Sequence, residues 1–328
     1  MLCRLPGKGM MTMKYAAKRI AMLLVTMVIV SFLAFVAFSL ISGSAAEIML
    51  GTQATPEKVA ALEKEMGLDR PLLVRYGEWL LGFFTGDLGT SISYKQPVQQ
   101  LIAPKVLVTL CLSVLSFLLI VAVSIPLGVR SARRAGGRLD GVSTALNQFC
   151  MAVPPFFTGI LLTWLFSTVL RWFTHGKFPD LGTDFPGTVK YLFFAAISIA
   201  IPRVAMTVRM LRSTVLGEMQ KDYVRTAISR GNDRTGVLYG HVLKNALVPV
   251  VTFLAQTMAE IVAGSIVVEQ VFAIPGLGRL LVASISNRDY PVVQAIVVIL
   301  AFWVVLAGTV ADLINQRIDP RLRLGGGE

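Results

Sequence analysis

The chain has 328 residues, of which 55% are hydrophobic and only 15% are charged, whereas an ordinary soluble domain carries about a quarter charged residues. This composition and a mean hydropathy of +0.68 exclude an ordinary water-soluble globule. The formal net charge is +12, which in a soluble protein would indicate a nucleic acid or another acidic partner.

The hydrophobic pattern predicts an all-α polytopic membrane protein with six transmembrane helices, because a helix needs about 20 apolar residues to cross a bilayer. Four of the segments are uncharged over 22 residues or more, and two span only if each tolerates one internal charge, Arg203 or Glu260. The six predicted spans are 20–46, 105–129, 141–170, 187–208, 246–268 and 290–311.

The first apolar segment also has features of a secretory signal, because basic residues precede it and Ser44-Ala45-Ala46 resembles a cleavage site. Its 27 uncharged residues exceed the roughly 7–15 of a signal core. We therefore expect an uncleaved anchor. The natural start is left open among Met1, Met10, Met11 and Met13.

The distribution of charge predicts the orientation. The predicted cytoplasmic segments hold 19 basic and 7 acidic residues, whereas the external loops, counted to their flanking charges, hold 11 of each. The excess lies on one face, as the positive-inside rule requires, so both termini are predicted inside. The cytoplasmic segments are 1–19, 130–140, 209–245 and 312–328, and the external loops are 47–104, 171–186 and 269–289.

Several function classes lose support from the same pattern. The basic residues lie in separate loops without the aromatic-interleaved stripe of a nucleic-acid binder. Cys3, Cys111 and Cys150 lack metal-ligand or disulfide spacing, and His175 and His241 are predicted on opposite sides of the membrane. We expect no metal, no cofactor and no catalytic residue in this chain.

Nucleotide binding is also unsupported. The glycine-rich turn Pro275–Gly278 follows no strand and precedes no Gly-Lys-Ser/Thr, so it lacks the context of a phosphate-binding loop. If this protein uses ATP, another polypeptide binds it.

The external loop 47–104 predicts a short helix, with Thr55 as its N-cap, Pro56 at its first position and Gly67 as its stop. An apolar stretch with Trp79 follows it. This loop is either a small cap on the outer membrane surface or a docking surface for an external partner.

The cytoplasmic loop 209–245 is the most informative stretch. Apolar residues at helical spacing predict a helix from about Thr214 to Arg230 that ends at Gly231. Asn232 or Asp233 can cap a second helix that leads through His241 into the fifth span. The loop is either a helical element that fits a groove in a soluble partner or a solvated connection that positions the spans.

The residues of this loop resemble the EAA-type coupling loop of ABC importer permeases, in the form found in dipeptide, oligopeptide and nickel transporters. The resemblance rests on 222–227, Gly231 and 241–246; Arg225 stands where the general motif has Glu, and Lys244 where it has Pro. Five further stretches resemble the same branch in order: 67–72, 86–91, 272–279, 287–291 and 319–321. Ser42-Gly43-Ser44 departs from the Pro-Gly-Asp of many relatives.

The resemblance, which covers nearly the whole chain, implies a permease subunit of the first type in a binding-protein-dependent importer of the bacterial or archaeal cytoplasmic membrane. It would enclose half of a path for di- or oligopeptides, with nickel or a nickel chelate as the alternative cargo. The implied partners are a second homologous permease, two cytosolic ABC ATPase subunits and an external or periplasmic substrate-binding protein. The implied ATPase-coupling residues are Tyr223, Arg225, Thr226, Ala227, Gly231 and His241.

Arg203 and Glu260 are the two charges inside predicted spans, and such groups usually have a partner or face a wet cavity. They either form a structural ion pair or line the translocation path. A secondary transporter or channel also fits six spans, but it leaves the coupling loop unexplained. A membrane enzyme would need converging reactive groups, which the sequence does not show.

Overall fold

The computed structural model describes residues 8–40, 50, 54–65, 67 and 69–318. The described part is almost entirely helical and its only bridge is an isolated antiparallel one between Thr90 and Pro97. The predicted all-α class is confirmed. Predictions that involve Met1, Cys3, Ser42–Ser44 and Asp319–Arg321 lie outside the described residues.

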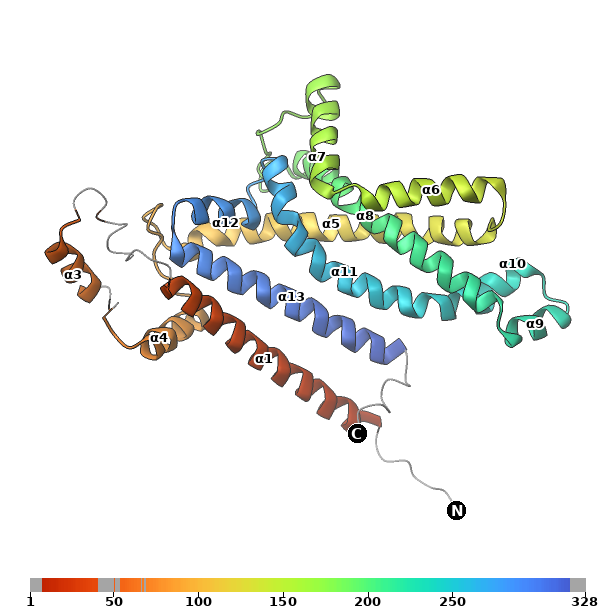
Figure 1. The fold of residues 1–328 in the computed structure, drawn as a ribbon, viewed down its shortest axis with the longest axis horizontal. Coiled ribbons are helices and arrows are strands. Elements are labelled where there is room, and N and C mark those ends of the chain that lie inside the picture. The colour runs from red at the N-terminus through yellow and green to blue at the C-terminus, as the bar shows by residue number, and fades with distance from the viewer. Residues whose placement is uncertain (1–7, 41–49, 51–53, 66, 68, 319–328) are drawn as a thin grey trace, which may run out of the picture. The chain divides into compact units, whose positions relative to one another are not determined.

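Five helices are long and apolar enough to cross a membrane, and a bent pair of shorter helices provides a sixth crossing if it counts as one span. The predicted polytopic class therefore agrees with the structure. The five are α1 (Lys8–Leu40), α5 (Val98–Arg133), α8 (Phe185–Met219), α11 (Leu243–Val271) and α13 (Tyr290–Ile318), as Figure 1 labels them. The shorter helices include α3 (Pro56–Glu65), α4 (Leu72–Thr85) and α12 (Leu277–Ser286).

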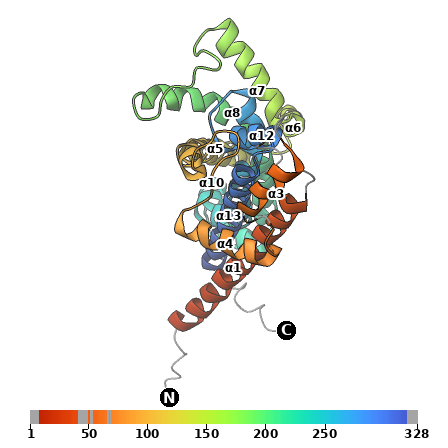
Figure 2. The same cartoon turned by 90° about the vertical axis from the view of Figure 1, so that its left-hand side faces the viewer.

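The segment predicted as one span at 141–170 is two helices in the structure. α6 (Arg138–Ala152) and α7 (Pro155–Thr163) meet at an angle of 93°, and Figures 1 and 2 show α7 turned away from α6. The cause is the Pro154-Pro155 pair, because a residue before proline is driven out of the helical region. Pro154 is accordingly extended, with φ −66° and ψ 146°.

The chain forms two compact units, the first made of Met1–Val108 with Pro275–Leu306 and the second of Thr109–Ile274 with Ala307–Glu328. In the first unit α4 lies along α1. The Tyr76 hydroxyl donates to the Val28 carbonyl at 3.1 Å, and the Phe32 and Phe35 rings meet Tyr76 edge-on. The helix predicted from Pro56 is α3, and its first turn includes a 3.4 Å bond from the Lys58 amide to Thr55 Oγ1.

A buried carboxylate holds two loops of the first unit together. Asp289 is fully buried and accepts hydrogen bonds from the Ser91 hydroxyl at 2.5 Å, the Ile92 amide at 3.1 Å and the Ser93 amide at 3.3 Å. A carboxylate is buried at acceptable cost only with such partners. Asp289 therefore fixes the 91–93 loop beside the start of α13.

α8 is the central helix of the second unit. Small buried residues such as Ala195, Ala196 and Ala200 allow its neighbours to approach closely. Pro202 lies inside α8 and has no N–H for the Ser198 carbonyl four residues earlier. The Thr158 hydroxyl of α7 approaches that carbonyl to 3.3 Å and shares its one proton between it and the Pro155 carbonyl of its own helix at 2.9 Å.

Replacing Asp289 by alanine removes the acceptor of the 91–93 loop. A hydrogen bond to a charged group contributes about 1.5–3 kcal/mol, so losing even one raises the open population of the loop about ten- to hundredfold. We expect trypsin to cleave the D289A chain after the exposed Lys95 at least about tenfold faster than the wild type. D69A, at an exposed carboxylate, is the control; equal cleavage of the two variants would contradict the role of Asp289.

Candidate functional site

The connection between α8 and α11 contains two short helices, α9 (Asp222–Ser229) and α10 (Arg234–Val237), at one end of those two long helices (Figure 1). The single helix predicted from Thr214 to Arg230 is divided in the structure, because α8 ends at Met219 and the chain turns at Gln220 and Lys221 before α9 begins. At this junction the Gln220 amide donates to the Gly217 carbonyl and the Lys221 amide to the Glu218 carbonyl, so two tight turns separate α8 from α9.

α9 has one buried face and one exposed polar face. Val224 is 1% exposed, whereas the side chains of Arg225 and Asp222 are 78% and 97% exposed and lie 3.8 Å apart. Thr226 is also exposed, and Ala227 is half-buried. The helix is therefore anchored by its apolar side and presents charge and a hydroxyl to the surroundings.

Tyr223 connects three elements. Its hydroxyl donates to the Glu218 carboxylate at the end of α8 at 2.8 Å, and it accepts a 3.3 Å bond from the Asn245 amide at the start of α11. Lys221 forms an ion pair with the same carboxylate. Burial, and secondarily the Glu218 carboxylate, raises the pKa of Tyr223, so its hydroxyl stays protonated at neutral pH and can donate. α9 is thus tied to both long helices by one side chain.

Gly231 and Asp233 shape the turn after α9. Gly231 has φ +89°, a conformation that L side chains resist. The Asn232 amide donates to the Ala227 carbonyl at 3.0 Å, so Asn232 closes α9. Asp233 instead caps α10, where its carboxylate accepts from the Thr235 amide at 3.1 Å and the Gly236 amide at 3.2 Å.

His241 lies in a π-helical segment, Leu238–Val242, that joins α10 to α11. Val237 and Val242 are fully buried, whereas His241 is exposed and has no side-chain hydrogen-bond partner among the described residues. The structure therefore places the six residues of the predicted coupling site on one short connection. Arg225, Thr226, Gly231 and His241 are exposed and available to a partner.

Arg203 of α8 and Glu260 of α11 form a hydrogen-bonded ion pair about midway along these helices. The two side chains are 27% and 53% exposed, so the pair lies on an open face rather than inside the packed unit. An exposed pair of charges in a spanning helix faces water or another protein rather than lipid.

In the parts of the chain that the structure describes, no group of three or more His, Cys, Asp or Glu side chains is placed to hold a metal ion. The contacts of the α9–α10 connection are structural: Tyr223 joins α9 to α8 and α11, and the buried valines Val224, Val237 and Val242 anchor the connection.

The sequence did not single out the residues that hold this connection in place. Glu218 is only one of the acidic residues near Tyr223, and Asn245 only one residue of the stretch 241–246 that resembles a coupling loop. Asp289 lies in a stretch that resembles the family, but nothing there indicates its partners Ser91 and Ile92, which lie almost two hundred positions away.

Two family models match almost the entire chain. "Binding-protein-dependent transport system inner membrane component" matches residues 124–324, and the N-terminal membrane component of the same transport systems matches 11–113. Between them they cover both compact units.

The curated relatives are permeases. A Brucella abortus protein named as a peptide transport system permease protein is 38% identical over 93% of this chain and 98% of the relative's chain. The oligopeptide transport system permease AppB of Bacillus subtilis is 35% identical over 94% and 98%. The glutathione transport system permease GsiC of Salmonella choleraesuis is 33% identical over 95% and 99%.

Replacing Tyr223 by phenylalanine removes the hydroxyl that joins α8, α9 and α11. Because a hydrogen bond contributes about 0.5–1.5 kcal/mol, we expect the amide hydrogens of α9 to exchange about two- to tenfold faster, as measured by hydrogen-exchange mass spectrometry. Tyr239 is a matched control, since its side chain is 48% exposed and its hydroxyl has no hydrogen-bond partner among the described residues. The same acceleration in Y239F would count against the role of Tyr223.

Proposed function

The chain belongs to the family of binding-protein-dependent transport system inner membrane components, and from this premise we propose that it encloses half of the translocation path of an ATP-driven importer. It is a non-catalytic, inner-membrane permease subunit of an ABC importer. Such a binding-protein-dependent importer implies that the subunit has ATPase and substrate-binding partners. We propose that the other half of the path comes from a second homologous permease and that two ATPase subunits drive the pair.

The observation that carries the coupling mechanism is the placement of α9. This helix is short, presents Arg225 and Thr226 outward, and lies between two long helices to which Tyr223 binds it. A helix of this kind fits a groove in a soluble partner. The proposed partner is the cytosolic ATPase, with His241 at the edge of the contact.

The coupling itself needs no reactive group in this chain. When ATP closes the ATPase pair, the docked α9 moves with its groove. Because hydrogen bonds join Tyr223 to Glu218 of α8 and Asn245 of α11, α8 and α11 move with it. Packed interfaces respond to such small displacements by switching between discrete arrangements, and the path then opens alternately to the two sides.

This mechanism requires α9 to lie in the cytoplasm. The basic excess on the predicted segments 1–19, 130–140, 209–245 and 312–328 supports that orientation, with both termini inside. The external loops 47–104 and 269–289 then face the substrate-binding protein. The Asp289 contact with the 91–93 loop gives that side a fixed surface.

The proposed cargo is a peptide. Relatives named for peptide, oligopeptide and glutathione transport support it, and nickel or a nickel chelate is the alternative. In this kind of importer the binding protein delivers the cargo. Calorimetry of the cognate binding protein with dipeptides, oligopeptides and nickel therefore separates the alternatives.

We propose that the Arg203–Glu260 pair faces the translocation path. The pair is exposed on the isolated chain, and it joins α8 to α11, the two long helices that the α9–α10 connection links. Cargo with charged ends would meet both signs of charge at this level of the path. The pair also joins α8 to α11 directly, so it holds the path wall together as the wall moves.

The coupling proposal predicts which subunits co-purify. A tagged full chain, extracted from its native membrane in mild detergent, should bring down two ABC ATPases and a second permease.

A β-branched residue is strongly disfavoured at positive φ, so we expect G231V to retain less than about a tenth of the ATPase, because such strain costs at least about 1–2 kcal/mol. The amount of chain in the membrane should not change.

Gly136 supplies the matched control. Its φ is +85°, and a Cβ added at either glycine would meet no atom within 4 Å. G136V carries the same backbone strain in a different loop and should keep the ATPase. Equal loss from both variants would attribute the effect to strain alone, and transport-active chain without any ATPase would overturn the function.

The ion pair predicts the outcome of a charge exchange. We expect R203E and E260R each to lose most uptake of the substrate that calorimetry identifies, and the double variant R203E/E260R to recover at least half of it. K177E reverses an exposed charge in the external loop 171–186, which has no assigned contact, and should leave uptake unchanged. Failure of the double variant, with normal insertion, would indicate that the two charges contact the cargo separately.

A further inference from the structure

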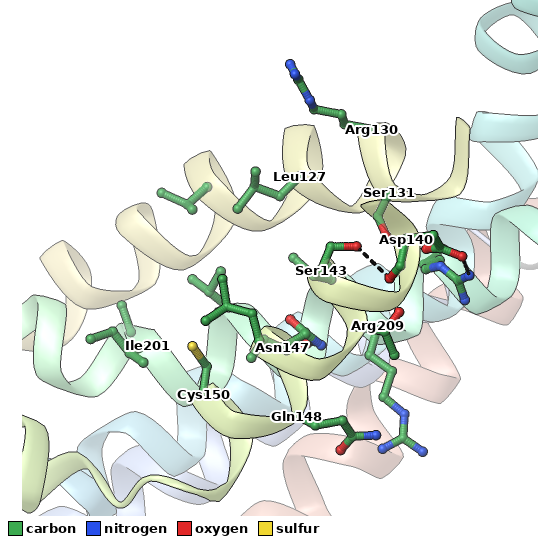
Figure 3. Close-up of a pocket in the computed structure, with 18 of the residues that line it drawn as sticks. Leu127, Arg130, Ser131, Asp140, Ser143, Asn147, Gln148, Cys150, Ile201 and Arg209 are labelled. Carbon is green, nitrogen blue, oxygen red and sulfur yellow. Dashed lines mark hydrogen bonds and ion pairs between the residues drawn. The ribbon is translucent and has the colours of Figure 1, made fainter. Parts of the chain in front are cut away.

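A cavity of about 720 Å³ lies between α5, α6 and α8, inside the second unit (Figure 3). Sites for small ligands usually measure about 300–1,000 Å³. The walls are mainly apolar, with Leu127 from α5, Leu146 from α6 and Ile201 from α8. Leu127 and Leu146 are 47% and 62% exposed, so the described chain leaves much of this surface uncovered.

The charges at the mouth of the cavity are strongly unbalanced. Four arginines, Arg130, Arg134, Arg209 and Arg212, line it against a single acidic residue, Asp140. Arg212 donates to Asp140 at 2.6 Å. The other three are exposed and have no ion pair or side-chain hydrogen bond among the described residues. Three uncompensated positive charges therefore lie at the mouth.

The apolar walls have the depth of one membrane leaflet. On α5 the first lining residue is Leu119 and the first arginine of the lining is Arg130, and the eleven steps between them cover about 16 Å at the helical rise. Half of a bilayer core is about 15 Å. Figure 3 shows Arg130 and Arg209 at opposite edges, extending away from the apolar walls around Leu127 and Ile201. The guanidinium groups thus lie where lipid headgroups begin.

Two buried polar atoms in the lining have no partner. Arg212 keeps an unpaired Nε–H, and Asp140 keeps an unpaired Oδ1. A phosphate oxygen can accept from the first and a hydroxyl can donate to the second. Arginine also binds phosphate in a two-bond fork. These features require a ligand that combines a phosphate, a headgroup hydroxyl and an apolar chain.

We propose that this cavity binds an anionic phospholipid of the surrounding leaflet, of the phosphatidylglycerol class. Its phosphate lies beside Arg134 and the unpaired Nε–H of Arg212, Arg130 and Arg209 add positive charge at the two edges, and an acyl chain lies along Leu127 and Ile201. Basic pockets between membrane helices are known to hold anionic headgroups. A free phosphate would leave the apolar walls bare, and the headgroup of a zwitterionic lipid carries its own positive charge beside the phosphate.

The test uses the full chain, co-purified with its partner subunits and placed in nanodiscs. A phosphatidylglycerol with a diazirine on one acyl chain is photoactivated, and labelled peptides are mapped by mass spectrometry. We expect labelling of the peptides that contain Leu146 and Ile201. Unlabelled dioleoylphosphatidylglycerol should reduce it at least about tenfold more effectively than dioleoylphosphatidylcholine or glycerol 1-phosphate, since a tenfold preference marks a specific site.

Charge variants locate the headgroup. R134Q/R209Q should lose most of the labelling, whereas R133Q/R171Q should keep it, because Arg133 and Arg171 do not line the cavity. Size-exclusion chromatography checks that both variants are folded, and the competition on the wild type stands independently of them.

Four results would overturn the proposal: equal competition by phosphatidylcholine, displacement by glycerol 1-phosphate, equal loss in the two double variants, or no labelling of the cavity in the assembled complex. The last would mean that a partner subunit covers the site. None of these results bears on the coupling role of α9, which the ATPase co-purification tests separately.

Discussion

The hydrocarbon core of a bilayer offers no hydrogen-bond partner to a peptide group, and the rest of this structure depends on that constraint. The five long helices satisfy their own backbones. Where Pro202 leaves the Ser198 carbonyl of α8 without an N–H, the Thr158 hydroxyl of α7 approaches that carbonyl to 3.3 Å while it also contacts the Pro155 carbonyl of its own helix. The carbonyl that proline leaves free thus becomes a specific contact between two helices of the packed unit.

Charge follows the same logic. Most charged residues lie beyond the apolar segments, and the basic excess on one predicted face accounts for the whole net charge of +12. Arg203 and Glu260 are tolerated within the apolar helices α8 and α11 because the two side chains form an ion pair. The Arg203–Glu260 pair and the open cavity between α5, α6 and α8 are both surfaces that the chain by itself leaves uncovered. The charged pair is suited to water or protein beside it, and the apolar cavity is suited to lipid.

Local patterns predicted what depends on local chemistry. Uninterrupted apolar runs predicted the membrane helices, the Thr55-Pro56 pair predicted the start of α3, and Gly231 predicted where α9 ends. The Pro154-Pro155 pair is also a local signal for the bend between α6 and α7, but the uncharged run from 141 to 170 favoured a single span instead. The partners of Tyr223 and Asp289 could not be predicted, because each joins residues that are brought together only by the packed helices.

The π-helical segment Leu238–Val242 has a mechanical consequence for the connection between α10 and α11. A π turn holds one more residue than an α turn in a similar rise. Moving that extra residue along the helix shifts the residues that it passes by about 1.5 Å and turns them by roughly 100°, while the helix on either side keeps its place. The junction can therefore turn a few side chains toward a different neighbour without losing its backbone hydrogen bonds.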